Sequence, residues 1–144
     1  MRIREIIQAK GTAVVTVDPD RLVIDAMKVL VQHGIGAVIV TRGLEIAGIL
    51  SERDVLRLGA ASPRALETTK VGEAMTRDLI VAVLDDDLEY AMNVMTTNRI
   101  RHLPILDGSR LAGMLSIGDV VNALRTRVES ENRHLRDYIQ GISA

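Results

Sequence analysis

The sequence predicts an α+β (mixed α/β) fold, built from two copies of one βαββα unit that pack sheet to sheet with pseudo-twofold symmetry. Three observations support this prediction: an internal repeat, the same order of strand and helix signals in each copy, and a repeat too short to cover its own sheet. The 144 residues, 47% hydrophobic and 26% charged, suffice for a compact domain with a real core.

The internal repeat is visible as a direct alignment of the chain with itself. Residues 15–55 align without a gap with residues 80–120, a displacement of 65 positions. Within this match, Ala-Gly-Ile-Leu-Ser at 47–51 aligns with Ala-Gly-Met-Leu-Ser at 112–116. A fixed period of this length indicates a duplicated structural unit. Upstream, residues 3–7 resemble 71–75 at a displacement of 68, so the first copy carries three extra residues around 8–12.

Each copy predicts the same elements in the same order. Short runs rich in β-branched residues predict strands, and Arg42-Gly43 and Asp107-Gly108 predict turns between paired strands. Aspartates at 18–20 and 85–87 predict the starts of the helices that follow, with acids near the positive helix end. The expected strands are 14–17, 36–40 and 46–50 in the first copy, and 80–83, 102–106 and 111–115 in the second.

A single copy leaves one face of its sheet uncovered, and two copies facing each other solve that problem. Such a pair forms two equivalent clefts, one for each copy. We expect the first copy over residues 1–60, a linker over 61–69 with Pro63, the second copy over 70–127, and a C-terminal helical extension over 128–144. The last helix, from Val120 to about Gln140, carries an incomplete apolar stripe. We expect the stripe to pack against a partner or the module's own flank.

Composition argues against several classes of protein. A formal net charge of −1, with 1% aromatic residues, does not favour a nucleic-acid surface. The sequence has no cysteine, and its three histidines lack metal-ligand spacing, so we expect no metal site. For the aspartates at 85–87, helix capping is a simpler explanation than Mg²⁺ binding. No long apolar run or signal peptide is evident, and no nucleophile has an evident base. We therefore expect a cytoplasmic protein that does not act on a membrane and is not an enzyme.

Two motifs and one strand carry a resemblance to a known family. They are Gly48–Val55 (GILSERDV), Gly113–Val120 (GMLSIGDV) and Arg99–Ile105 (RIRHLPI). From about Ile3 to Arg125, the chain resembles the CBS-domain family, named after cystathionine β-synthase, whose tandem pairs are called Bateman modules. The resemblance implies a regulatory module that binds AMP, ADP, ATP, S-adenosylmethionine or an NAD-type ligand. It also implies a homodimer of the short stand-alone prokaryotic type.

The two Ser-x-x-Asp motifs are the candidate nucleotide-binding groups. Ser51 and Ser116 lie where a strand meets a helix, and free N–H groups there favour a phosphate. Asp54 and Asp119 follow one turn later, and a carboxylate accepts both hydroxyl protons of a ribose. The resemblance implies the same roles. Ser-x-x-Asp is also a helix capping box that needs no ligand, so both interpretations stay open and can coexist.

Three further side chains supply charge for a phosphate. Arg101 and His102 open a strand of the second copy, where the first copy has neutral residues, and Arg53 lies in the motif of the first copy. The two clefts are therefore expected to differ. An exposed structural role is the alternative for the arginines, and a satisfied, partly buried position for the histidine. Adenine would lie among aliphatic side chains: Ile35 and Ile49 in one cleft, Ile100 and Met114 in the other.

The function expected from these features is a nucleotide sensor that signals to a partner by a change of conformation. The alternative is a ligand-independent dimerisation or scaffold module, in which the serines and aspartates only cap helices. A third hypothesis, an enzyme fragment or nucleotide hydrolase, has no supporting motif.

Overall fold

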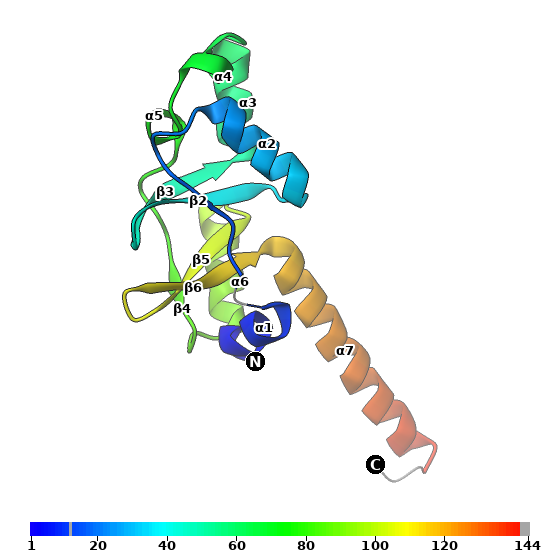
Figure 1. Cartoon of the computed structure of the whole chain (residues 1–144). Helices are drawn as coiled ribbons and strands as arrows, with labels where there is room; N and C mark the ends of the chain where they lie inside the picture. Colours follow the sequence, from blue (N-terminus) through cyan, green and yellow to red (C-terminus); the bar gives the residue numbers. More distant parts are fainter. Residues whose placement is uncertain (12, 142–144) are drawn as a thin grey trace.

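The computed structural model describes residues 1–11 and 13–141. Two three-stranded sheets lie one above the other, with α2 (Val23–His33) and α3 (Glu52–Ala61) beyond the upper sheet in Figure 1. Helices α1 (Ile3–Lys10) and α7 (Ile117–Ile139) lie on the other side of the lower sheet. The mixed α/β prediction, with two equivalent units, is confirmed.

The two sheets have the same topology. In the first, β1 (Thr16–Val17) runs parallel to β2 (Ala37–Arg42), which pairs antiparallel with β3 (Glu45–Ser51). In the second, β4 (Ala82–Val83), β5 (His102–Asp107) and β6 (Arg110–Ser116) repeat this arrangement. The first strand of each copy is shorter than predicted, because only two of its residues pair with the neighbouring strand. In the first copy the preceding residues, Val14 and Val15, line a pocket between the copies.

The remaining helices connect or cover these sheets. They are α4 (Ala65–Thr68), α5 (Val71–Ala74) and α6 (Leu88–Asn98). Helix α4 lies within the predicted linker and contacts α2 and α3. The connector is therefore a packed turn of helix against the first copy.

Helices α2 and α6 begin shortly after the aspartates at 18–20 and 85–87, as predicted, but the capping hydrogen bond expected of the aspartates at 85–87 is absent. Neither helix has a side-chain cap hydrogen bond. Asp18 instead accepts the backbone N–H of Asp20 at 2.8 Å, and Asp86 accepts the N–H of Val83 at 2.9 Å. Asp85 pairs with Arg4 at 3.0 Å. A short carboxylate side chain reaches the nearest backbone donors, so these residues stabilise the turns between strand and helix.

The leading helix of each copy packs in the core of the other copy. Ile3 and Ile7 of α1 are buried in one cluster with Leu103 and Leu115 of the second copy. Val71 of α5 is buried in a separate cluster with residues of the first copy. The sequence repeats and the packed cores are therefore different units, and a simple division at the linker does not describe the packing.

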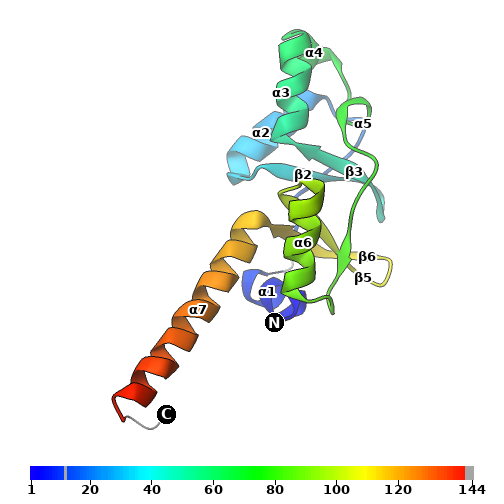
Figure 2. The same ribbon diagram turned by 180° about the vertical axis from the view of Figure 1, so that it is seen from behind.

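Helix α7 projects away from the two sheets, as both views show (Figures 1 and 2). Among its described residues only Val120 is fully buried, and Leu124 packs against the core of the second copy. Beyond that point Val128 and Leu135 are 53% and 59% exposed. The distal stripe therefore does not pack on the flank of its own chain.

Candidate functional site

Both Ser-x-x-Asp motifs form complete capping boxes. At α3 the backbone N–H of Ser51 donates to Asp54 Oδ2 at 2.9 Å, and the N–H of Asp54 donates to Ser51 Oγ at 3.3 Å. At α7 the matching distances between Ser116 and Asp119 are 2.9 and 3.1 Å. Both serines and both aspartates therefore cap their helices without any ligand. This capping leaves the second carboxylate oxygen of each aspartate outside the capping bonds.

Most N–H groups in the first turn of each helix are already occupied. The N–H of Glu52 donates to Gly36 O at 2.9 Å, and that of Ile117 donates to Arg101 O at 2.8 Å. With the capping bonds, these contacts leave the N–H groups of Arg53 and Gly118 without a hydrogen bond within residues 1–11 and 13–141. The sequence predicted several free N–H donors for a phosphate at each helix start, and the structure leaves one per helix within the described residues.

Two clefts lie between the copies, and each takes residues from both. We call the first the Ser51 cleft. It combines the start of α3 with the segment that leads from α6 into β5, and its volume is about 410 Å³. Its lining residues are Gly36, Ile49, Ser51, Glu52, Arg53, Asp54, Leu56, Arg57, Thr76, Arg99, Ile100, Arg101 and His102.

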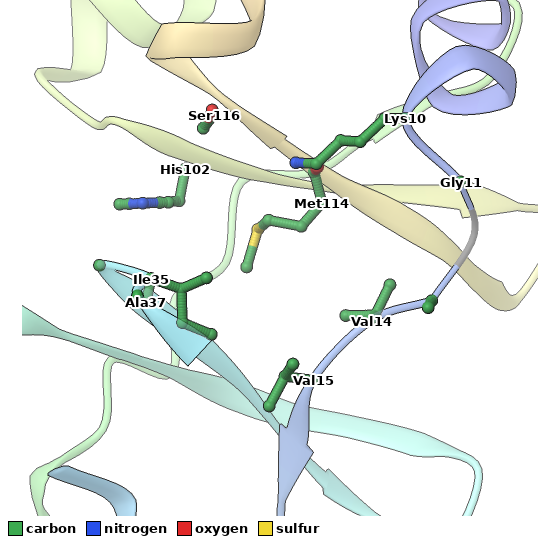
Figure 3. Close-up of a pocket in the computed structure, with 12 residues that line it drawn as sticks. Lys10, Gly11, Val14, Val15, Ile35, Ala37, His102, Met114 and Ser116 are labelled. Carbon is green, nitrogen blue, oxygen red and sulfur yellow. The ribbon is translucent and has the colours of Figure 1, made fainter. Parts of the chain in front are cut away.

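The second cleft, called the Ser116 cleft, combines the end of β6 with the segment after α1 and the segment after α2 (Figure 3). It is smaller, at about 280 Å³. Its lining residues are Lys10, Gly11, Ala13, Val14, Val15, Gly34, Ile35, Gly36, Ala37, His102, Met114 and Ser116.

The structure divides the predicted site residues differently from the sequence prediction. Arg53 and Arg101, assigned to separate clefts, both line the Ser51 cleft. The reason is geometric: face-to-face packing of two copies sets the helix start of one copy opposite the strand start of the other. His102 lines both clefts and separates them.

The expected apolar pairs are exchanged for the same reason. Ile49 lies with Ile100 in the Ser51 cleft. Ile35 lies with Met114 in the Ser116 cleft. The predicted pairing of Ile35 with Ile49, and of Ile100 with Met114, is therefore wrong. Each cleft nevertheless has at least one apolar side chain from each copy.

Lys10, at the end of α1, is a site residue that the sequence did not predict. Its ammonium donates to Asp119 Oδ2 at 2.7 Å and to the carbonyl oxygen of Met114 at 2.8 Å. In Figure 3 the Lys10 side chain extends across the cleft to Met114. Partial burial alone raises the pKa of Asp119, but hydrogen bonds from Lys10 and Ser116 outweigh burial, so the pKa lies below the usual value. In the sequence, the only sign that Lys10 differs from its surroundings is its place among the three extra residues of the first copy, around 8–12.

The corresponding group in the Ser51 cleft is a hydroxyl. Thr76 Oγ1 lies 3.2 Å from Asp54 Oδ1. The two carboxylates therefore differ in environment: Asp119 faces an ammonium and Asp54 faces a neutral hydroxyl. The Thr76 hydroxyl can rotate away from the carboxylate at little cost, whereas removal of the ammonium breaks an ion pair, so Asp54 is the more readily freed acceptor.

The imidazole of His102 lies between the two clefts, in surroundings that favour its neutral form. Burial lowers the pKa of its imidazole, an effect that Glu52 partly offsets and that Lys10 and Arg101 reinforce. A Cβ added to Gly36 would lie 3.3 Å from His102 Cε1. The backbone of one copy and the imidazole of the other are therefore in close contact where the two clefts meet.

Within residues 1–11 and 13–141, no group of three or more metal-binding side chains is assembled. No helix in this part of the chain is both long and apolar enough to cross a membrane.

The duplicated βαββα unit, with clefts between the copies, defines a module of two tandem repeats, and comparison with known proteins specifies its family. The family model of the CBS domain matches residues 3–61 and 71–126. The chain therefore belongs to the CBS-domain family. It is 42% identical over 127 residues to the mitochondrial CBS domain-containing protein CBSX3 of Arabidopsis thaliana, covering 85% of this chain and 62% of the relative. It is 33% identical over 109 residues to the CBS domain-containing protein YhcV of Bacillus subtilis, covering 76% and 77%.

Solved structures agree with this family. The CBS-domain containing protein ATU1752 from Agrobacterium tumefaciens superposes with a TM-score of 0.83 at 37% identity, covering 85% of this chain and 98% of that chain. The CBS domain pair of protein MJ0100, crystallised with 5′-methylthioadenosine and S-adenosyl-L-methionine, has a TM-score of 0.77 at 19% identity. This pair covers 88% of this chain and 98% of its own, and it shows likeness of fold alone.

Proposed function

We propose that this chain is a regulatory module that binds an adenine nucleotide in a cleft between its two CBS repeats. AMP, ADP, ATP and NAD-type ligands are the candidates, and the module signals to a partner protein. The observation that carries the proposal is a carboxylate one turn into each helix, with aliphatic side chains nearby. Asp54 lines the Ser51 cleft, and Asp119 is bonded to Lys10 and Ser116, which line the Ser116 cleft. The adenosine ligands of protein MJ0100 support the ligand class.

The chemistry of the clefts suits a nucleotide in three parts. A carboxylate accepts the two hydroxyl protons of a ribose. Aliphatic walls, Ile49 with Ile100 and Ile35 with Met114, suit a flat ring. Arg53, Arg101 and the Ser hydroxyls face the region where a phosphate would lie. The proposal includes no bond-breaking step.

Signalling follows from the position of the clefts between two separate cores. A ligand that contacts both repeats favours one relative arrangement of them over another. The ligand can affect a partner protein only if the ligand binds the two arrangements with different affinities. The predicted cytoplasmic location stays a prediction, since the Arabidopsis relative is named mitochondrial.

Calorimetry with AMP, ATP and NAD on the purified full chain tests the proposal. We expect at least one of them to bind below millimolar concentration. The double variant Asp54→Asn/Asp119→Asn should weaken binding, because each amide keeps the cap acceptor but lacks the full carboxylate. Asp107→Asn, an exposed position outside both clefts, is the matched control. No binding of any of the three nucleotides to the wild-type chain would refute the proposal.

The scaffold alternative has one observation in its favour. The apolar groove between α2 and α3 is lined by Val31 and Leu56, which are 82% and 73% exposed. We propose a second copy of this chain as its occupant, and a hexameric CBS-CP12 relative at 27% identity supports self-association. Light scattering should give a multiple of 15.7 kDa, and Val31→Glu should give the monomer. A stable dimer that binds no nucleotide would favour the scaffold function.

A further inference from the structure

We propose, building on the nucleotide-binding function above, that each chain binds one nucleoside polyphosphate, in the Ser51 cleft. Lys10 keeps the Ser116 cleft closed to ribose. Sequence duplication alone would give two equal sites. The contacts and charges of the two clefts make them unequal.

A cation already occupies one of the two carboxylate oxygens of Asp119, the expected ribose acceptor beside the Ser116 cleft. Asp119 Oδ2 accepts both the Lys10 ammonium at 2.7 Å and the Ser116 N–H at 2.9 Å. The same ammonium is held by the Met114 carbonyl at 2.8 Å. Asp119 Oδ1 makes no hydrogen bond with the described residues, but a ribose that places one hydroxyl on each carboxylate oxygen would have to displace the Lys10 ammonium from Oδ2. That displacement breaks an ion pair and leaves the ammonium with the Met114 carbonyl as its remaining partner. The Lys10 side chain also takes space in the smaller cleft, of about 280 Å³.

The Ser51 cleft has no such occupant. Asp54 Oδ1 accepts from the Thr76 hydroxyl at 3.2 Å, and Oδ2 accepts from the Ser51 N–H at 2.9 Å and the Ser51 hydroxyl at 3.1 Å. Both hydroxyls can rotate to donate or accept as a ligand requires. The volume of about 410 Å³ falls within the range of ligand sites, about 300 to 1,000 Å³. Ribose recognition at this carboxylate therefore requires no ion pair to break.

The Ser51 cleft is lined by more guanidinium groups than carboxylates. Its lining includes four arginines and two carboxylates, Glu52 and Asp54. None of the four guanidinium groups makes a hydrogen bond or ion pair with any other described residue of the chain. Guanidinium groups bind phosphate oxygens in pairs, so this set matches two or more phosphates. The four arginines are Arg53, Arg57, Arg99 and Arg101.

Arg99 adds an independent observation. It is the only described residue other than glycine with a positive φ, at 54°. The equivalent residue of the first copy is Gly34, with a φ of 61°. A left-handed conformation disfavours an arginine, yet the chain places one here, at the edge of the Ser51 cleft. Strain of this kind is found at functional sites, where the side chain has a role that glycine lacks.

Binding stoichiometry tests the Lys10 part. Calorimetry with ATP should give one site on the wild-type chain and two on Lys10→Met, whose side chain keeps its length but cannot hold Asp119. Asp54→Asn should lose most of the wild-type site, and Asp54→Asn/Lys10→Met should regain one site. Lys28→Met, which removes an exposed lysine of α2, should keep one site. Two wild-type sites, or one site in Lys10→Met, would overturn this part.

A comparison of ATP with AMP tests the polyphosphate part. We expect ATP to bind at least about tenfold more tightly, and Arg101→Gln to remove about tenfold of ATP affinity, as the loss of one charge-assisted contact predicts. Arg99→Gly should weaken ATP binding while raising the thermal midpoint, because it relieves the left-handed strain. Equal affinities for AMP and ATP would overturn this inference and leave the proposed function intact. Absence of all nucleotide binding would instead refute both.

Discussion

The carbonyl oxygen of Thr76 lies 2.6 Å from the position that a Cβ on Gly48 would occupy. Strand β3 and the segment after α5 thus meet backbone to backbone, joined by two hydrogen bonds between Ile49 and Thr76 at 2.9 and 3.0 Å. The equivalent glycine, Gly113, faces the end of a side chain: its Cβ would lie 2.9 Å from Ile7 Cδ1. The two positions match in sequence and differ in what they contact.

This difference predicts unequal costs for the same substitution. Gly48→Ala should lower the free energy of unfolding by about 2 to 3 kcal/mol, because a backbone carbonyl must move, and Gly113→Ala by about 1 kcal/mol, because Ile7 has other rotamers. Urea unfolding of both variants measures the difference. Equal losses would show that β3 moves as freely as the Ile7 side chain.

Removal of either serine cap should destabilise the chain without any ligand. Ser51→Ala and Ser116→Ala each leave a first-turn N–H unsatisfied, which lowers the free energy of unfolding by about 1 kcal/mol. Ser109→Ala, in the exposed β5–β6 turn, is the control and should be neutral. With ATP present, only Ser51→Ala should lose affinity as well. Equal affinity losses in both cap variants would contradict the assignment of the ligand to the Ser51 cleft.

His102 predicts a loss of stability in mild acid. Burial lowers the pKa of His102 in the folded chain, with Glu52 and Asp119 opposing that shift and Lys10 and Arg101 adding to it. The unfolded chain therefore binds a proton first as the pH falls below about 6.5. Stability is complete above that pH and decreases as the pH falls through the lower folded pKa.

The measurement is the urea midpoint at about pH 7.5 and pH 5.5. The urea midpoint of the wild type should be lower at about pH 5.5 than at about pH 7.5, and the decrease should be smaller for His102→Gln. His33→Gln, at an exposed position, should match the wild type. A wild-type midpoint that rises toward pH 5.5 would show that the nearby carboxylates dominate.

The distal part of α7 should be dispensable for folding. A chain that ends at Arg127 keeps Val120 and Leu124 in the core and loses one surface ion pair, between Arg127 and Glu131 at 3.4 Å. Exposed ion pairs contribute little, so the free energy of unfolding should change by less than about 1 kcal/mol. Thermal unfolding by circular dichroism measures this. A loss above about 2 kcal/mol would indicate that residues beyond 127 pack within an assembly.

The fold and the list of cleft residues were largely predictable from the sequence. The gapless repeat determined the order of strands and helices, and the alternation of turns determined the hairpins. The grouping of residues into clefts was not predictable, because it depends on which end of one copy lies opposite which end of the other. Arg53 and Arg101 lie 48 positions apart in the numbering, and only the packing places both in one cleft.

Lys10 and Thr76 show a second limit. Each is a common surface residue with no motif, and each becomes a site residue only because the leading helix crosses to the other copy. The N–H groups of Glu52 and Ile117 were expected to be free for a phosphate, but they donate to the carbonyl oxygens of Gly36 and Arg101. These acceptors lie in loops whose path no local sequence pattern specifies.

The leading helices α1 and α5 each pack in the core of the other copy, and this arrangement determines the order in which the chain can fold. As the chain emerges during synthesis, α1 is made well before its packing partners, Leu103 and Leu115. The first copy likewise lacks Val71 until the linker is complete. Contacts between such distant segments delay folding until most of the chain is available. A fragment with one repeat would lack its covering helix, and two such fragments would need to exchange helices to close their cores.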